Sequence, residues 1–366
     1  MWGAVLPNAR SPRLDVCDDI ELTGPPGPGE VRLRVHATGL CHSDLSAMDG
    51  SMPIRLPAVL GHEAAGTIVE VGEGVSTTQV GDHVVVAAVP PCGRCHFCVR
   101  GEAYLCVNFA SMFTPKSRHQ RRGEKLNAFC GIGSFAAHTV LPQDAVVPID
   151  PEVPFDVACI VGCAVVTGVG AVFNAAKMRP GATVVVLGCG GVGMSVVLGA
   201  RAAGASTIVA VDPSEAKQRT ALRLGATHAV PPDQLTVTGK AIHRGTGFDH
   251  AFEAVGRSQT VRAAYDAVRR GGSVVVLGIG DRKDPVQFSA YELAWSAKTV
   301  MGSTYGSGDV RHEFPRLLSL WRSGVLPLTE LISARLPIGE INEGLDAMRR
   351  GEGIRHVVQF TEGDCV

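Results

Sequence analysis

A run of β-branched residues that stops at three glycines limits the possible folds of this chain most strongly. Residues 183–193 read Thr-Val-Val-Val-Leu-Gly-Cys-Gly-Gly-Val-Gly, which spaces the glycines as Gly188, Gly190 and Gly193. The pattern predicts a buried strand, a tight turn and a helix over residues 192–203 that is small and apolar enough to pack on a parallel sheet. In such a unit the helix N-terminus faces a pyrophosphate, and the second glycine lets the backbone approach it. Alone, a glycine triplet of this kind is equally compatible with a simple turn.

The next predicted strand favours the dinucleotide interpretation. Residues 207–212 read Thr-Ile-Val-Ala-Val-Asp, so Asp212 follows Gly193 by 19 residues, where a carboxylate is needed for the ribose hydroxyls. Further units of the same kind follow, with helices predicted over 213–225 and 257–270 and strands over 248–253 and 273–278. The pattern predicts a doubly wound α/β domain with a parallel sheet.

Length and composition limit the partners. A chain of 366 residues is expected to form about two domains. Its net charge of −1, with 19% charged residues, argues against nucleic acid as a partner and favours a small soluble molecule.

Two stretches of the sequence bear on membrane insertion and export, and neither indicates them. The N-terminus lacks an apolar core long enough for a signal peptide. Residues 157–176 are apolar and uncharged, but Gly162, Gly168 and Gly170 favour a helix buried between domains over a membrane span. Eleven cysteines without a secretory signal indicate a reducing compartment, so we expect a cytoplasmic protein whose clustered thiols bind metal.

The first part of the chain, residues 1–161, reads as mostly strand. Alternating segments at 31–36, 66–71 and 81–87 are separated by glycines and by Pro-Pro-Gly-Pro-Gly at 25–29. This pattern predicts a compact, twisted β domain rather than repeated β-α-β units.

Four cysteines in this β domain form a strong metal pattern. Cys92, Cys95, Cys98 and Cys106 lie within 15 residues, with glycines between them. Four thiolates make a closed tetrahedral zinc site without an open position, which is typical of a structural metal. Unliganded buried cysteines would not be expected on a Pro-Pro-x-Gly loop at this spacing.

A second set of possible ligands is scattered along the chain. Cys41, the sequence Gly61-His62-Glu63, and Cys163 each have an ordinary explanation, since single histidines and free cysteines are common in protein cores. Spacing alone does not join them.

Taken together, Gly61-His62-Glu63-Ala-Ala-Gly66, the four-cysteine lobe and Gly188-Cys-Gly-Gly-Val-Gly193 resemble the zinc-dependent medium-chain alcohol dehydrogenase family. The resemblance covers essentially the whole chain, including closing segments at 340–346 and 351–355. It implies a GroES-like catalytic domain at 1–161 with the zinc lobe at about 90–107, an NAD-binding Rossmann domain at 162–304, and a return to the catalytic domain at 305–366.

The resemblance also implies roles around two zinc ions per chain. Cys41, His62 and Cys163 would bind the catalytic zinc, which Glu63 can approach transiently, and the four-cysteine lobe would bind the structural one. Asp44 would hold the zinc-binding histidine by a hydrogen bond, and Ser43 would accept the alcohol proton.

For the cofactor, the resemblance implies NAD bound by two groups of residues. The fingerprint turn supplies Gly188, Gly190, Gly191, Val192 and Gly193. The other implied contacts are Asp212 and Lys217 to the adenosine ribose, Arg355 and His42 near the pyrophosphate, and Thr167 beside the nicotinamide. Asp212 would favour NAD over NADP because it repels a 2′-phosphate.

The chain departs from the family pattern in three places. Ser46 stands where many members have a histidine that completes a proton relay, which leaves the relay beyond Ser43 open. His42 replaces an arginine of some relatives, so the anion contact is expected to be weaker and titratable. Residues 111–127 form a basic insertion that the dimeric branch tends to keep; we therefore expect a homodimer, and the alternative is that the insertion is only a solvated loop.

The implied reaction is reversible oxidation of an alcohol to an aldehyde or ketone, with hydride passing to NAD⁺ and zinc acting as a Lewis acid, in the cleft between the domains. Ala88 lies four residues before Cys92, where several relatives have a bulky aromatic residue. The pocket is therefore expected to favour long-chain or aromatic primary alcohols. The other expected wall residues are Met52, Phe129, Cys130 and Tyr305.

Three alternatives remain at this point. A thiol-dependent formaldehyde dehydrogenase is possible; Met52 and Ala110 replace an acid and an arginine of the glutathione enzymes, although mycothiol remains possible. A non-catalytic member would not need the open metal site formed by Cys41, His62 and Cys163. Zinc-free quinone reductases of the superfamily are disfavoured for the same reason.

Overall fold

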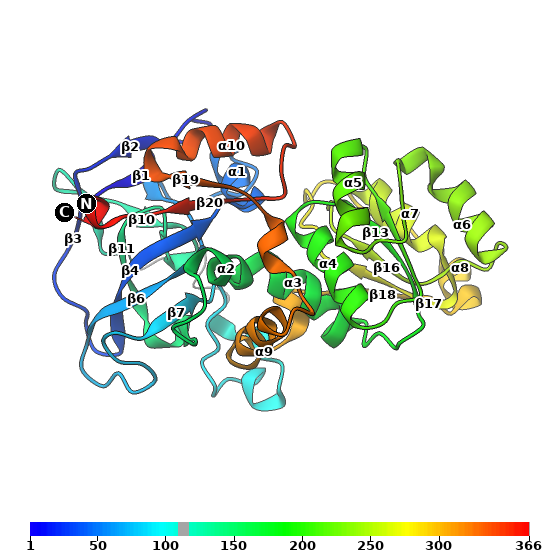
Figure 1. The fold of residues 1–366 in the computed structure, drawn as a ribbon, viewed down its shortest axis with the longest axis horizontal. Helices are drawn as coiled ribbons and strands as arrows, with labels where there is room; N and C mark the ends of the chain where they lie inside the picture. Colours follow the sequence, from blue (N-terminus) through cyan, green and yellow to red (C-terminus); the bar gives the residue numbers. More distant parts are fainter. Residues whose placement is uncertain (109–116, 366) are drawn as a thin grey trace. The chain divides into compact units, whose positions relative to one another are not determined.

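The computed structural model describes residues 1–108 and 117–365, which form two compact units (Figure 1). Unit 1 comprises Met1–Cys163, Asp309–Ser319 and Ile332–Val366, and unit 2 comprises Ala164–Gly308 and Leu320–Leu331. Each unit has its own sheets and core.

Unit 1 is built on mainly antiparallel sheets, in which the pairs β19–β20 and β10–β5 are parallel. Within its described residues, one sheet has the order β12-β7-β6-β4-β20-β19 with β11 also paired to β4, a second has the order β10-β5-β1-β2, and a third has the order β3-β8-β9. The strands are β1 (Gly3–Leu6), β2 (Asp15–Cys17), β3 (Ile20–Leu22), β4 (Glu30–Gly39), β5 (Ala58–Val59), β6 (Glu63–Val71), β7 (His83–Val86), β8 (His119–Arg121), β9 (Glu124–Lys125), β10 (Asn127–Ala128), β11 (His138–Pro142), β12 (Val146–Pro148), β19 (Ile332–Pro337) and β20 (Arg355–Gln359).

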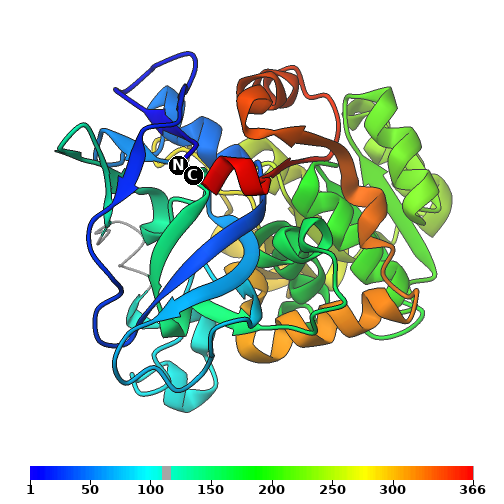
Figure 2. The same ribbon diagram turned by 60° about the vertical axis from the view of Figure 1, so that its left-hand side comes forward.

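The strands predicted at 31–36 and 66–71 lie within β4 and β6, and the segment predicted at 81–87 contains the shorter β7. In β4, Val31, Leu33 and Val35 are fully buried while the residues between them are partly exposed, which is the alternation expected for a strand with one face on a core. The C-terminal strand β20 lies beside β4, and the two chain ends are close together (Figure 2). The backbone N–H of Trp2 donates to the carbonyl of Asp364 at 2.9 Å.

Four α-helices lie wholly or partly among the described residues of unit 1. They are α1 (His42–Asp49), α2 (Phe155–Ile160), α10 (Ile341–Arg349) and the first part of α9 (Val310–Arg322). Helix α1 follows directly from the end of β4, and Gly50 (φ +82°) ends it. This arrangement places the start of α1 beside the first residues of β6.

Unit 2 contains a six-stranded parallel sheet among its described residues, in the order β15-β14-β13-β16-β17-β18. The doubly wound prediction is confirmed. The strands are β13 (Thr183–Leu187), β14 (Thr207–Val211), β15 (His228–Val230), β16 (Phe248–Glu253), β17 (Val268–Val276) and β18 (Thr299–Gly302), and the helices are α3 (Val166–Gly170), α4 (Gly191–Ala202), α5 (Glu215–Leu224), α6 (Leu235–His243), α7 (Ser258–Ala267) and α8 (Ala290–Ser296). The strand order reverses between β13 and β16, which is the switch point where ligands bind in this fold.

One predicted boundary in unit 2 is wrong. The helix predicted over 257–270 ends at Ala267, and β17 begins at Val268 rather than at residue 273. Val268 has extended backbone angles (φ −81°, ψ 147°) and pairs with Phe248 of β16. Pairing with the neighbouring strand therefore overrides the helical pattern of residues 268–270.

The long apolar stretch forms a helix, Phe155–Ala175, in which two π-helical turns, η6 (Val161–Val165) and η7 (Ala171–Ala175), interrupt the α-helical parts. It is long and apolar enough to cross a membrane, yet 83% of its most apolar 18-residue window is buried. Within unit 2, a Cβ at Gly168 would lie 2.6 Å from Ser195 Cβ, so α3 packs closely on α4. The prediction that this stretch is a buried helix rather than a membrane span is confirmed.

Candidate metal and dinucleotide sites

The four-cysteine lobe brings its thiols together within a single loop. The sulfur atoms of Cys92, Cys95, Cys98 and Cys106 all lie within 4.8 Å of one another, and those of Cys95 and Cys106 are 3.9 Å apart. Gly93 (φ +73°) turns the backbone in the left-handed region, which lets the loop fold back on itself. Four sulfur ligands at this separation fit zinc in a closed site.

Backbone N–H groups in the lobe point at the sulfurs. The N–H groups of Cys92 and Asn108 donate to Cys106 Sγ at 3.3 and 3.4 Å. A hydrogen bond from the backbone of Cys98 lowers the pKa of Cys95 to about 6, whereas burial raises the pKa of Cys98 to about 12. A bound cation would hold all four cysteines as thiolates.

A second group is assembled from three separate segments of unit 1. One ligand atom from each of Cys41, His62, Glu63 and Cys163 lies within 4.8 Å of the others. Cys41 follows β4 and His62 precedes β6, and these strands pair so that Gly39 is opposite Glu63. Cys163 comes from the π-helical turn η6.

Two glycines allow these segments to approach. Gly61 has φ +86°, and a Cβ there would lie 2.5 Å from Ser134 Oγ. A Cβ at Gly162 would lie 2.9 Å from the carbonyl oxygen of Val86 in β7. Larger residues would displace His62 or Cys163, the respective neighbours of these glycines, from the group.

Asp44 ties the first two segments together. It is fully buried, and its Oδ2 accepts from the Cys41 N–H at 2.9 Å while its Oδ1 accepts from the Gly61 N–H at 3.2 Å. The same Oδ1 lies 3.5 Å from His62 Nδ1, beyond the usual length of a hydrogen bond. His62 Nδ1 has no hydrogen-bond partner within the described residues, and Asp44 Oδ1 is close enough to orient the ring if the contact shortens.

Glu63 is paired with an arginine from the C-terminal strand. Its carboxylate is fully buried, and Oε1 lies 3.1 Å from Arg355 Nη1, an ion pair without the geometry of a hydrogen bond. The same Nη1 donates to the carbonyl of Leu40 at 2.7 Å. Burial raises the pKa of Glu63 to about 8. Arg355 thus lies beside the second metal group, and its contact with a pyrophosphate stays a prediction.

The charges of the second group are coupled. A hydrogen bond from Cys163 lowers the pKa of Cys41 well below its ordinary value, and the same contact, with burial, raises the pKa of Cys163. Burial acts to lower the pKa of His62, but the Asp44 carboxylate and Cys41 raise it well above its ordinary value. A bound cation would favour the thiolate forms of both cysteines and the neutral form of His62.

Several predicted neighbours of the metal lie beside this group. The Phe129 ring contacts His62 edge-on, with ring centroids 5.4 Å apart. Ser43 Oγ lies 3.7 Å from Cys41 Sγ. Cys130 is buried at φ +55°, and burial raises the pKa of its thiol to about 12.

Other predicted residues are placed less directly. Ala88 is buried just after β7, Met52 is half-buried just after α1, and His42 is exposed at the start of α1. Tyr305 is buried and Thr167 is half-buried, both in unit 2.

The glycine-rich turn of unit 2 has the form that a pyrophosphate requires. Gly188 adopts φ +91°, and a Cβ at Gly193 would overlap the carbonyl oxygen of Gly188. At Gly190 a Cβ would meet no described atom within 4 Å, which leaves open space in front of α4. Gly191 and Val192 form the first turn of that helix. The helix N-terminus and the open turn fit an anionic group.

Asp212 is held in place directly after β14. Its Oδ2 accepts from the Cys189 N–H at 2.8 Å and its Oδ1 from the Ser214 N–H at 2.9 Å. Ser214 also caps α5, where the Lys217 N–H donates to its hydroxyl at 3.5 Å. The carboxylate is thereby fixed beside the glycine-rich turn.

The basic insertion is only partly described. Ala110 and residues 111–116 lie outside the described residues, and residues 119–125 form the hairpin β8–β9. Arg121 and Arg122 both bind Asp19, at 2.6 and 2.7 Å, so this part is held by ion pairs rather than merely solvated.

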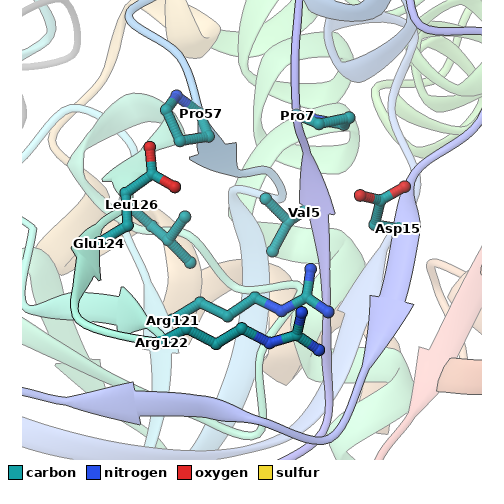
Figure 3. Close-up of a pocket in the computed structure, with 8 residues that line it drawn as sticks. All are labelled: Val5, Pro7, Asp15, Pro57, Arg121, Arg122, Glu124 and Leu126. Atoms are coloured by element: carbon teal, nitrogen blue, oxygen red, sulfur yellow. The ribbon is translucent and has the colours of Figure 1, made fainter.

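The two arginines also line a pocket of about 310 Å³ (Figure 3). Its lining is Val5, Pro7, Asp15, Pro57, Arg121, Arg122, Glu124 and Leu126. The carboxylates at the pocket and Asp19 offset the two guanidinium charges, and its lining includes no residue of either metal group. We assign no function to this pocket.

Sequence reasoning missed two buried groups. The pairing of Glu63 with Arg355 joins strands that are far apart in the chain, and no local pattern announces it. Glu253 is fully buried at the end of β16, and its only sequence signal is an acid at the end of a predicted strand.

Comparison with known proteins gives consistent matches. Residues 27–152 match the family described as alcohol dehydrogenase GroES-like domain, and residues 191–323 match that described as zinc-binding dehydrogenase. The chain is 39% identical to the "Putative alcohol dehydrogenase D" of Mycobacterium tuberculosis, covering 93% of this chain and 95% of the relative. It is 36% identical to the S-(hydroxymethyl)glutathione dehydrogenase of a Synechocystis species, covering 92% and 94%. The crystal structure of benzyl alcohol dehydrogenase from Acinetobacter calcoaceticus superposes with a TM-score of 0.91 at 32% identity, covering 98% of this chain and 99% of that one.

Proposed function

The chain belongs to the zinc-containing medium-chain alcohol dehydrogenase family and is a zinc-dependent alcohol dehydrogenase, and we propose that it interconverts bulky primary alcohols and their aldehydes with NAD. The observation that carries this proposal is the group of Cys41, His62 and Cys163, of which the first two are buried and the third is half-buried. Three protein ligands of this type leave a fourth coordination position of the metal open for substrate, whereas four cysteine ligands fill every position.

We assign the catalytic zinc to the group of Cys41, His62 and Cys163 and the structural zinc to the four-cysteine lobe. The catalytic zinc would supply Lewis-acid chemistry that lowers the pKa of an alcohol. Asp44 keeps Cys41 and His62 in position, and Ser43, beside Cys41, is placed to accept the alcohol proton. Phe129 covers one side of His62 and limits the access of water.

The proposed hydride acceptor is NAD, bound at the turn from Gly188 to Gly193. The open space at Gly190 and the N-terminus of α4 support pyrophosphate binding there. Asp212 supports NAD over NADP, because a carboxylate fixed in this place accepts hydrogen bonds from the ribose hydroxyls of NAD and repels the 2′-phosphate of NADP. Equal wild-type kcat/KM with the two cofactors would contradict this choice.

The domain assignment follows the same logic. We propose that residues 1–161 and 305–366 form the catalytic domain and residues 162–304 the NAD-binding domain. Cys41, His62 and the four-cysteine lobe lie within residues 1–161, Cys163 lies just past that boundary, and the glycine-rich turn lies within residues 162–304, which supports this division of labour.

The proposed substrates are aromatic or long-chain alcohols. Ala88 supports this choice because it is small where several relatives are aromatic, and the structural neighbour at 32% identity is itself named as a benzyl alcohol dehydrogenase. A filled apolar pocket discriminates by roughly 1–3 kcal/mol per methylene. Ala88→Phe should therefore reduce kcat/KM for benzyl alcohol or octanol far more than for ethanol. Equal effects on both would exclude Ala88 as the determinant of pocket size.

A second candidate function is thiol-dependent formaldehyde oxidation. The relative at 36% identity that is named S-(hydroxymethyl)glutathione dehydrogenase favours it. Met52, which replaces an acid of the glutathione enzymes, argues against glutathione but not against mycothiol.

We further propose a homodimer formed through the edge of the unit 2 sheet. Strand β18 is the last strand of its sheet among the described residues, so its outer N–H and C=O groups are available to a second strand. Nearby apolar residues are exposed: Ile279 (84%), Tyr291 (73%), Trp295 (64%) and Val300 (37%). Sedimentation should show a dimer, and Val300→Lys should weaken it; a wild-type monomer would refute the proposal.

A cytoplasmic location is also proposed. The eleven cysteines are all free, and many are placed to bind metal, which suits a reducing compartment. Cell fractionation tests this location.

An alcohol and aldehyde panel, followed at the absorbance of NADH with and without low-molecular-weight thiols, tests the main proposal. Turnover of benzyl alcohol or octanol without thiol supports it. Activity only on formaldehyde with a thiol would select the second candidate.

A further inference from the structure

Glu253 is a buried acid at the switch point of the unit 2 sheet. It is the last residue of β16 and pairs in register with Leu187, the last residue of β13 before the Gly188 turn. Its side chain is fully buried. Burying a carboxylate is costly unless hydrogen bonds satisfy it, so its place here calls for a specific reason.

One oxygen of Glu253 holds the turn that follows the strand. Oε1 accepts hydrogen bonds from the N–H groups of Val255 at 2.9 Å and Gly256 at 2.8 Å, and from the Thr260 hydroxyl at 2.6 Å. Gly256 adopts φ +83°, so the turn bends sharply around this oxygen. Because Thr260 lies in the first turn of α7, the carboxylate fastens the strand end, the turn and the helix together.

The turn held by Glu253 packs against two other loops at the same edge of the sheet. A Cβ at Gly188 would lie 2.6 Å from Val255 Cγ2, and a Cβ at Gly280 would overlap the carbonyl oxygen of Gly256. The N–H groups of Leu277 and residue 278 donate to the Glu253 carbonyl at 2.8 and 3.1 Å. Residues 254–256 are therefore wedged between the glycine-rich turn and the loop after β17.

A second carboxylate on the same strand gives the contrast. Asp249, near the amino end of β16, has both oxygens bonded: Oδ2 accepts from the N–H and hydroxyl of Thr183, each at 2.8 Å, and Oδ1 accepts from Arg269 at 2.7 Å. Glu253 Oε2 is buried and has no hydrogen-bond partner in the described part of the chain. A carboxylate with a purely structural role in the sheet, such as that of Asp249, thus has both oxygens hydrogen-bonded. Glu253 leaves one acceptor unused, and it lies at the carboxyl edge, where ligands bind in this fold.

We propose that Glu253 is a positioning residue for the dinucleotide. It fixes residues 254–256 against the Gly188 turn, so that the backbone facing the pyrophosphate keeps its shape. Binding free energy then depends on the carboxylate although Glu253 touches no ligand. This inference rests on the proposed use of NAD.

The test measures the Kd for NADH by fluorescence titration, together with the thermal midpoint and zinc content. Glu253→Ala should raise the Kd at least about tenfold, the equivalent of one hydrogen bond to a charged group. Glu253→Gln should stay within about threefold of wild type, because the amide oxygen can still accept the turn's N–H groups. The matched control is Asp249→Ala, which should lower the thermal midpoint but leave the Kd within about twofold of wild type.

Equal rises in Kd for Glu253→Ala and Asp249→Ala would overturn the proposal, because affinity would then follow stability alone; an unchanged Kd for Glu253→Ala would do the same. If Glu253→Ala does not fold, Thr260→Val removes only one of the three bonds and should raise the Kd about threefold; an unchanged Kd in that variant would count against the proposal. A wild-type protein that binds no NADH would instead refute the proposed cofactor, and this inference with it.

Discussion

The two metal groups of unit 1 are built in opposite ways. The four-cysteine lobe lies within one loop, and its thiols are held by turns and N–H groups of the same loop. The group of Cys41, His62 and Cys163 is gathered from three segments by the β4–β6 ladder and a π-helical turn.

The two groups differ in whether the surrounding structure needs the metal to keep its shape. The lobe has little apolar core of its own, so it needs its metal to keep its shape. The dispersed group has a scaffold that exists without metal, because Asp44 and the Glu63–Arg355 pair fix its segments. Metal should therefore be a matter of stability in the first and of activity in the second.

The largest expected effect comes from Cys163→Ala. Removing a ligand of the dispersed group should reduce kcat/KM by roughly 10³-fold or more, since the Lewis acid supplies several kcal/mol to the transition state. Metal analysis should fall from about two zinc ions per chain to about one. The thermal midpoint should change little.

Cys159→Ala is the matched control, since Cys159 is buried one turn earlier in the same helix and its thiol donates to the Asp156 carbonyl. It should keep both zinc ions and most of the activity. Equal losses in the two variants would mean that the helix, rather than the metal, is being disturbed.

Asp44→Asn should give a smaller loss of the same kind. The amide keeps the size of the side chain but loses the charge that faces His62 and replaces one acceptor by a donor, opposite either the Cys41 or the Gly61 N–H. Activity and affinity for the catalytic zinc should both fall about 10–100-fold. Titration with a zinc chelator measures this, and the lobe's zinc should be retained; loss of both metals together would contradict the separation of the two groups.

Cys98→Ser should reverse the pattern. The lobe should lose its zinc, and the thermal midpoint should fall by roughly 5–15 °C, as expected for a loss of several kcal/mol in a chain of this size. Below the new midpoint, kcat/KM should remain within about threefold of wild type. A large drop in kcat/KM in folded protein would show that the lobe also shapes the active site.

The smallest effect is a pH dependence of the scaffold that carries both groups. Burial lowers the pKa of His119, which is 1% exposed, to about 4. The unfolded chain, with an ordinary pKa near 6.5, then binds more protons than the folded chain between about pH 6.5 and 4. The free energy of unfolding should fall as the pH drops through this range, by at most about 3 kcal/mol for this residue.

Urea unfolding at several pH values measures that change. His119→Gln should reduce the fall in the free energy of unfolding between pH 6.5 and 4. Part of that fall should remain, because burial also lowers the pKa values of His36 and His138 to about 4. An identical pH profile in the variant would show that His119 is not the group that titrates.

The sequence by itself determined the features that depend on neighbours in the chain. The strand, glycine turn and helix at 183–202 follow from periodicity and from backbone angles that only glycine adopts easily, and the four cysteines reveal themselves because a single loop holds all of them. The scattered ligands could be predicted only through resemblance to a family, since no local pattern links Cys41, His62 and Cys163.

Only the tertiary structure decided which distant residues meet. The register of β4 against β6 brings Cys41 to His62, and β20, which pairs with β4, brings Arg355 to Glu63. Pairing of Val268 with Phe248 ended a helix that local propensity would have continued. The reason is physical: periodicity and turn residues act within a few positions, whereas strand register and burial depend on contacts between segments far apart in the chain, whose partners a sequence pattern does not name.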